Sequence, residues 1–177
     1  EGAKAAVNGA LWDLAGKILG VPTCVLLGGR WRDRVEGVWH VSALDPEEVA
    51  AEAGEGLGLG YRVYKLKVGQ RTVVEDLTRL RALRERVGAE AVIDVDANEA
   101  WTAEEAARFC REAKAYCVRM LEQPTSREDW EETRRVLGLC DGVALDEGAV
   151  GLEEAERRTR EVERGGLVVK VMKAGGP

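Results

Sequence analysis

Five short motifs with charged side chains recur along this chain of 177 residues, each after a run rich in Val, Ile or Leu. Their central residues are Lys67, Asp96, Glu122, Asp146 and Lys170, and they follow one another at intervals of 29, 26, 24 and 24 residues. Each interval accommodates one strand and one helix, so the spacing predicts a repeated βα unit. In a parallel barrel, reactive residues at the C-terminal ends of successive strands build one active site.

The segments between the motifs predict alternating strands and helices after a first helix over residues 3–19. The expected strands cover residues 35–43, 61–68, 91–96, 118–122, 142–146 and 167–173. The expected helices cover residues 46–57, 73–87, 103–116, 127–137 and 152–164. The strands show little polar alternation, as expected for a sheet that helices cover.

Six βα units are fewer than the eight of a closed barrel. A doubly wound sheet is the alternative, but it places its ligand at a single switch point, whereas here almost every strand end carries a charged group. No GxGxxG or Walker-type loop indicates a nucleotide site. We expect an α/β fold, a partial (β/α)8 TIM-type barrel. Residues 1–30 would form a helix and turn that lead into the barrel, and residues 31–177 an incomplete catalytic barrel.

The composition of the chain argues against several classes of function. The net charge is −6 and no basic block stands out, which argues against nucleic-acid binding. No apolar run approaches the roughly 18 residues of a membrane span. The opening, without an initiator Met or a signal peptide, suggests a piece of a longer protein. Four cysteines without a CxxC pair predict reduced core thiols in a cytoplasmic protein: Cys24, Cys110, Cys117 and Cys140.

Lys65 and Lys67 share one face of their expected strand, because strand side chains alternate with a period of two. The charged face cannot lie against apolar helices, so we expect both lysines to point into the barrel. Mutual repulsion and partial desolvation favour the neutral amine, which suits a general base. The alternative is an ion-paired strand at the edge of a sheet.

Asp96, Glu122 and Asp146 come from three consecutive strand ends. Neighbouring strands lie about 4.8 Å apart, so the three carboxylates would repel unless a cation lay between them. Oxygen ligands without His or Cys suit Mg²⁺ or Mn²⁺. The alternative for each acid is a solvated loop residue or a helix cap.

The remaining charged residues near the strand ends receive separate predictions. Lys170 lies across the ring from Lys67, so that amines could flank a bound substrate on both faces. Lys173, three residues further on, is expected to point to the other face and to be structural. Asp94 shares the inward face and could pair with Lys65 or be solvated, and His40 is expected to pack or to form hydrogen bonds.

The ordered set of motifs resembles the enolase superfamily, and within it the muconate-lactonizing subgroup of cycloisomerases, dipeptide epimerases and N-acylamino acid racemases. The motifs are Lys65-x-Lys67, Asp96-x-Asn98, Glu122-Gln-Pro, Asp146-Glu and Lys170-x-x-Lys-x-Gly-Gly, and the segment from Ala10 to Gly29 is also similar to these enzymes.

The resemblance implies a Mg²⁺ ion (Mn²⁺ is the alternative) held by Asp96, Glu122 and Asp146. The ion would stabilise the enolate formed when a proton α to a substrate carboxylate leaves. Lys67 and Lys170 would be the bases on the two faces of the substrate. Lys65 would orient the carboxylate and tune Lys67, and Asn98 and Glu147 would support the ligands.

The implied activity is racemisation, epimerisation or cycloisomerisation of a small-molecule carboxylate by a homo-oligomeric isomerase. The family also has a capping domain and two more βα units, which we expect this sequence to lack. Two alternatives therefore stay open. The chain could be a non-catalytic barrel segment or interaction module, or it could be part of a dehydratase of the superfamily.

Overall fold

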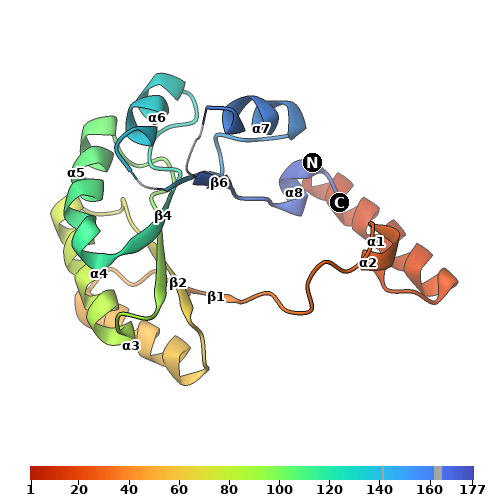
Figure 1. Cartoon of the computed structure of the whole chain (residues 1–177), viewed down its shortest axis with the longest axis horizontal. Coiled ribbons are helices and arrows are strands. Elements are labelled where there is room, and N and C mark those ends of the chain that lie inside the picture. The colour runs from red at the N-terminus through yellow and green to blue at the C-terminus, as the bar shows by residue number, and fades with distance from the viewer. Residues whose placement is uncertain (141, 162–164) are drawn as a thin grey trace.

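The computed structural model describes residues 1–140, 142–161 and 165–177. Within these ranges, parallel strands form one sheet in sequential order: β1 (Val38–Val41), β2 (Val63–Lys67), β3 (Val92–Asp96), β4 (Val118–Glu122), β5 (Val143–Leu145) and β6 (Gly165–Leu167). The connecting helices are α3 (Pro46–Gly58), α4 (Val73–Val87), α5 (Ala103–Ala113), η1 (Lys114–Tyr116), α6 (Trp130–Leu137) and α7 (Leu152–Thr159). They follow the outer side of the curved sheet (Figure 1). The predicted partial barrel of six βα units is confirmed.

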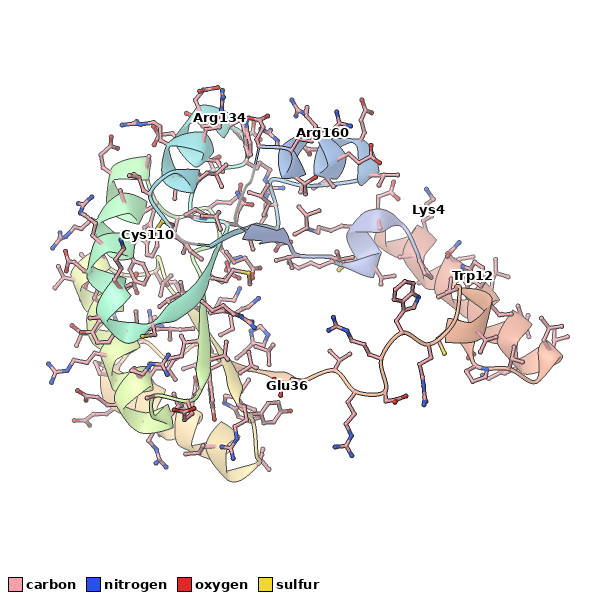
Figure 2. All side chains as sticks on the ribbon, in the orientation of Figure 1. Lys4, Trp12, Glu36, Cys110, Arg134 and Arg160 are labelled. Carbon is pink, nitrogen blue, oxygen red and sulfur yellow. A yellow bond between two sulfur atoms is a disulfide. The ribbon has the colours of Figure 1, made fainter. Side chains whose placement is uncertain are left out.

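Three further helices lie on the opposite side of the sheet from α4 and α5: α1 (Gly2–Leu19), α2 (Thr23–Leu26) and α8 (Val171–Ala174) (Figure 1). The α1 helix packs against α8, and Glu36 lies on the extended connection from α2 to β1 (Figure 2). Gly20 ends α1 in the left-handed conformation, with φ 69°. None of the described helices is long and apolar enough to cross a membrane. The division of the chain at residue 30 stays a prediction.

Strand register separates an apolar face from a charged one. Val41, Leu66 and Val95 lie side by side on β1, β2 and β3, are 0% exposed and face the helices. The next row, Lys67 beside Asp96, carries charge on the opposite face. Because paired residues of a parallel sheet point the same way, one register fixes both the core and the charged layer.

Helix N-caps determine where the helices begin after the charged strand ends. Thr72 and Thr102 each accept a hydrogen bond from the backbone N–H three residues on, and Glu75 and Glu105 bond back, so both helices begin with a capping box. The α6 helix begins at Trp130 rather than near residue 127, because Asp129 provides its N-cap. These caps fix α4 and α5 close to the strand ends that they follow.

Three predictions about the chain are wrong. The sixth strand covers Gly165–Leu167 rather than residues 167–173, and Lys170 is the N-cap of α8. The first strand is shorter than residues 35–43, and Val35 is 84% exposed. The last long helix ends at Thr159, so its predicted continuation is wrong over residues 160–161, and residues 162–164 lie outside the described residues.

The prediction of reduced core thiols is also wrong for two cysteines. Cys110 of α5 and Cys140, which follows α6, form a disulfide across 30 residues of sequence. Cys110 lies among the outer helices (Figure 2). The disulfide lies near the N-terminal ends of β4 and β5, away from the charged strand ends. Cys24 and Cys117 are free thiols, and Cys117 is exposed.

Candidate active site

Three buried carboxylates gather at the C-terminal ends of neighbouring strands. Asp96 ends β3 and lies in register beside Glu122, which ends β4, and Asp146 directly follows β5. Their exposed fractions are 1%, 2% and 0%. Burying three acids at one edge costs free energy unless positive charges lie beside them. We therefore expect cationic side chains or a metal ion next to these carboxylates.

The main chain around these acids adopts uncommon conformations. Asn98, Glu99 and Gln123 have positive φ angles of 43°, 68° and 34°. Such strain in residues other than glycine costs of order 1–3 kcal/mol each and concentrates at functional sites. Here it turns the chain back over the acids, so that the Asn98 N–H donates to Asp96 Oδ1 at 2.9 Å.

Gln123 connects the second carboxylate to the third. Its side chain is fully buried, and its Oε1 accepts the backbone N–H groups of Asp146 at 3.0 Å and Gly148 at 2.9 Å. Its Nε2 donates to the Thr125 carbonyl at 2.9 Å. Both polar atoms of this amide therefore help to hold the end of β5 beside the end of β4.

The two lysines of β2 lie on the face predicted for them and each meets a carboxylate. Lys67 Nζ lies 2.5 Å from Asp96 Oδ2 and 2.7 Å from Asn98 Oδ1. Lys65 Nζ donates to Glu122 Oε2. Since the side chain of Lys67 is 29% exposed and that of Lys65 is 14% exposed, Lys67 is the more accessible amine.

Lys170 and Lys173 both meet the third carboxylate. Lys170 Nζ donates to Asp146 Oδ2, and Lys173 Nζ lies 2.5 Å from Oδ1 and 2.6 Å from the Asp146 carbonyl oxygen. The prediction that Lys173 points to the other face is wrong. Residues three apart share one side of a helix, and Lys173 lies on α8 with Lys170 at its N-cap.

The charges shift the titration of several groups. Burial raises the pKa of Glu122, and the neighbouring Asp96 and Asp146 charges add to that rise against the opposing effect of Lys65. Burial also works to raise the pKa of Asp146, but hydrogen bonds from Lys170 and Lys173 outweigh it and lower that pKa. The Asp146 carboxylate in turn raises the pKa of Lys170. At neutral pH this end of the site therefore holds an ion pair.

The layer of side chains below the acids contains His40, in register with Lys65, which itself lies beside Asp94. His40 is largely exposed, but the shielding of part of its ring from water, together with the charges of Lys65 and Lys67, lowers its pKa. Asp94 is buried but does not pair with Lys65. Arg119 Nε and Nη2 hold its two oxygens at 2.9 and 2.6 Å, because a bulge in the β3–β4 register leaves Arg119 free to turn inward.

The two expected supporting residues lie at the rim of the site. Asn98 Nδ2 donates to Glu147 Oε1 at 3.2 Å, so it joins Lys67 to the segment after β5. Gln123, Lys173 and Arg119 were not among the predicted site residues. Only Gln123 had a usable signal, its place between a strand-end Glu and Pro124, whereas the bulge and the short helix have no clear pattern in the sequence.

The three acids offer the donor atoms of a cation site without its geometry. Within the described ranges, no three His, Cys, Asp or Glu side chains converge to hold one ion. Instead, four ammonium groups lie against the three carboxylates and supply the positive charge. Carboxylate oxygens without thiol or imidazole donors suit a hard divalent cation, so the residues present fit Mg²⁺.

Comparisons with known proteins agree with this site. The chain is 33% identical to the L-Ala-D/L-Glu epimerase of Bacillus subtilis over 98% of its own length and 48% of the relative's. It is 34% identical to the chloromuconate cycloisomerase of Cupriavidus pinatubonensis over 98% and 47%. The dipeptide epimerase of Cytophaga hutchinsonii, solved with Mg and the dipeptide D-Ala-L-Val, superposes with a TM-score of 0.91 at 28% identity, over 98% of this chain and 47% of that one.

The chain thus spans about half the length of the curated relatives that it matches. Those relatives are isomerases. Residues 48–177 match the family described as enolase C-terminal domain-like. The chain belongs to the enolase superfamily, in its muconate-lactonizing subgroup.

Proposed function

We propose that this chain carries the active site of an isomerase that removes the proton α to a substrate carboxylate, leading to racemisation, epimerisation or cycloisomerisation. The observation that carries the proposal is the layer of three buried carboxylates with lysines on both sides of it. The relatives whose names specify epimerisation, racemisation and cycloisomerisation support this reaction class.

Asp96, Glu122 and Asp146 are the residues that would hold Mg²⁺. A carboxylate α-proton is far too weakly acidic for an amine alone, and the bound cation would supply the charge that stabilises the enolate. The chain's own contribution is positional. The Asn98 main-chain N–H donates to the Asp96 carboxylate, and the buried Gln123 side chain accepts the Asp146 main-chain N–H, so both acids are held in place by fixed neighbours.

Lys67 and Lys170 are the proposed bases on the two faces of the substrate. In the structure each ammonium is paired with an acid, Lys67 with Asp96 and Lys170 with Asp146. A substrate carboxylate and a cation between the acids would compete for these pairs and release the amines toward the α-carbon. Lys65, the least exposed of these three lysines, would orient the substrate carboxylate.

The test is exchange of the α-proton in D₂O with Mg²⁺ and a panel of dipeptides and N-acylamino acids, followed by NMR. We expect Lys67→Ala and Lys170→Ala each to reduce exchange by about 10³-fold or more, while Mn²⁺ affinity stays within a few-fold. Lys17→Ala, which removes an exposed lysine of α1, is the control. Full exchange in both site variants would refute the assignment of the bases.

A second candidate function is a barrel segment that retains the ligands but acts only after another polypeptide joins it. The favouring observation is exposed apolar surface after β6, where Val169 is 81% exposed and Met172 61% exposed. Under this candidate the chain binds Mn²⁺ without exchanging any α-proton, and a separately produced remainder of the relatives' length restores exchange.

A further inference from the structure

One buried ion pair lies outside the charged layer. Asp76 and Arg79 of α4 are both 0% exposed, and Arg79 Nη1 donates to Asp76 Oδ1 at 2.7 Å. Desolvating two charges often costs as much as their attraction returns, so apolar residues would stabilise this position as well or better. The contacts of the pair, rather than its net stability, therefore indicate its role.

Arg79 also donates hydrogen bonds to backbone carbonyl groups at the C-terminal ends of two strands. Its Nη2 donates to the carbonyl oxygen of Lys67 at 2.8 Å and to that of Ala43 at 2.6 Å. Its Nε donates to the same Ala43 oxygen at 3.0 Å. One rigid guanidinium thus joins the C-terminal end of β2 to the chain directly after β1.

Asp76 holds the same segment two residues further on. Its Oδ2 accepts the Gly69 N–H at 2.7 Å. Gly69 has φ +85°, and a Cβ there would lie 2.5 Å from the Cβ of Ala100. Between them, the Val68 N–H donates to the Asp96 carbonyl oxygen at 2.9 Å. Residues 67–69 are therefore held from α4 on one side and from the β3 end on the other.

We propose that the Asp76–Arg79 pair is a positioning element for Lys67. The pair fixes the main chain of Lys67 on the helix side, while the ammonium lies on the opposite face against Asp96. A displacement of about 1 Å in a reacting group can cost about 10²-fold in rate. The inference rests on the proposed role of Lys67 as a base, and it assigns to two buried residues a task in the reaction without substrate contact.

The same helix provides a matched control at the other end of the sheet. Arg84 donates to the carbonyl oxygens of Gly88 and Ala91 at 2.7 Å each and of Tyr116 at 3.0 Å. These acceptors precede β3 and β4, so Arg84 holds the N-terminal ends of strands. Replacing either arginine by lysine removes a guanidinium that binds backbone carbonyls, but only Arg79 touches the segment of Lys67.

The experiment compares Arg79→Lys, Arg84→Lys and Asp76→Asn in the whole chain. The Lys67 ammonium resonance is followed by NMR in ¹⁵N-lysine-labelled protein and assigned with Lys67→Arg. Steady-state α-proton exchange gives kcat and KM, and urea unfolding gives stability. We expect both arginine variants to lose comparable stability. Arg79→Lys should shift the Lys67 resonance and lower kcat about 10- to 100-fold with KM within about twofold, whereas Arg84→Lys should change neither.

Asp76→Asn keeps an acceptor for Gly69 but leaves Arg79 without its charge partner. It should therefore shift the Lys67 resonance in the same direction as Arg79→Lys. This second variant provides the test if Arg79→Lys does not fold. A Lys67 resonance unchanged in Arg79→Lys and Asp76→Asn, or shifted equally in Arg84→Lys, would overturn the proposal. If the wild-type chain exchanges no α-proton, the proposed function of the isolated chain fails, and the resonance alone still decides the positioning role.

Discussion

The C-terminal and N-terminal ends of the parallel strands are each stabilised by a different kind of interaction. At the C-terminal end, four lysines meet three buried acids, and three residues other than glycine adopt positive φ around them. At the N-terminal end, Arg84 binds main-chain carbonyls, and a disulfide closes α5 onto the segment after α6. A cavity of about 300 Å³, lined by Phe109, Leu121 and the disulfide cysteines among others, also lies there.

The difference shows how one scaffold separates stability from chemistry. Charges and strained main chain at the C-terminal end are unfavourable in isolation and persist only where the surrounding structure fixes them. The covalent link and carbonyl contacts at the N-terminal end are favourable without any ligand. Substitutions at the N-terminal end should therefore lower only the stability of the fold. Substitutions at the C-terminal end should also displace the acids and lysines of the site.

The disulfide offers the largest expected effect on stability. In the Cys110→Ala/Cys140→Ala variant, the unfolded chain regains the entropy of a loop with a sequence separation of 30 residues. The chain-entropy relation gives a loss of about 3.6 kcal/mol, measured as a lower urea midpoint. The Lys67 ammonium resonance should not move, because the link lies at the opposite end of the sheet.

Replacing the free thiols, as Cys24→Ala and Cys117→Ala, is the matched control and should leave the midpoint almost unchanged. An equal midpoint in oxidised and reduced wild-type protein would show that the link adds no stability. A shifted Lys67 resonance in the double variant would show that the two ends of the sheet are coupled.

Gln123→Ala should cost less stability but disturb the site more. It leaves the buried N–H groups of Asp146 and Gly148 without their acceptor, and each unsatisfied group costs about 1–3 kcal/mol before water enters. We expect a net loss of about 2 kcal/mol, together with weaker Mn²⁺ binding as Asp146 moves. Gln123→Glu retains an acceptor for both groups and should lose less. Unchanged Mn²⁺ affinity in Gln123→Ala would contradict this bracing role.

Sequence patterns correctly predicted those site residues that lie on regular strands. Period-two alternation placed Lys65 and Lys67 on one face, and the strand ends placed Asp96 beside Glu122. The same rule failed for Lys173, because the residues from Val171 to Ala174 form a short helix rather than a strand. Val168, Val169 and Val171 have the composition of a strand, yet strand formation also needs neighbours to pair with, and composition does not report them.

Long-range pairings were the other features that the sequence did not reveal. Arg119 reaches Asp94 only because one extra residue bulges between β3 and β4, and no local pattern marks that insertion. The Cys110–Cys140 link depends on how α5 and α6 dock, which spacing alone does not determine. Buried Arg79 likewise reads as an ordinary charged helix residue until the strand ends around it are known.

The smallest expected effect comes from an ion pair at the edge of the site. Arg127 donates its backbone N–H, Nε and Nη2 to Glu99, at 2.7, 3.0 and 2.7 Å. The hydrogen bond from the Arg127 side chain lowers the pKa of Glu99 below its usual 4.5, although partial burial opposes the shift. Since the Arg127 side chain is 49% exposed, solvent screens the pair and its contribution is small.

Because the pKa of Glu99 is lower in the folded state, the pair stabilises the fold fully above the unfolded value and ceases to do so as pH falls through the folded value. We therefore expect Glu99→Gln to lower the urea midpoint slightly at about pH 6, and the difference from wild type to shrink as the pH falls below the unfolded value. Glu153→Gln, which removes an exposed glutamate of α7, is the control. A difference that grows on acidification would mean that Glu99 is destabilising as a charge. In that case, stabilisation of the C-terminal end by paired charges would be restricted to its buried pairs.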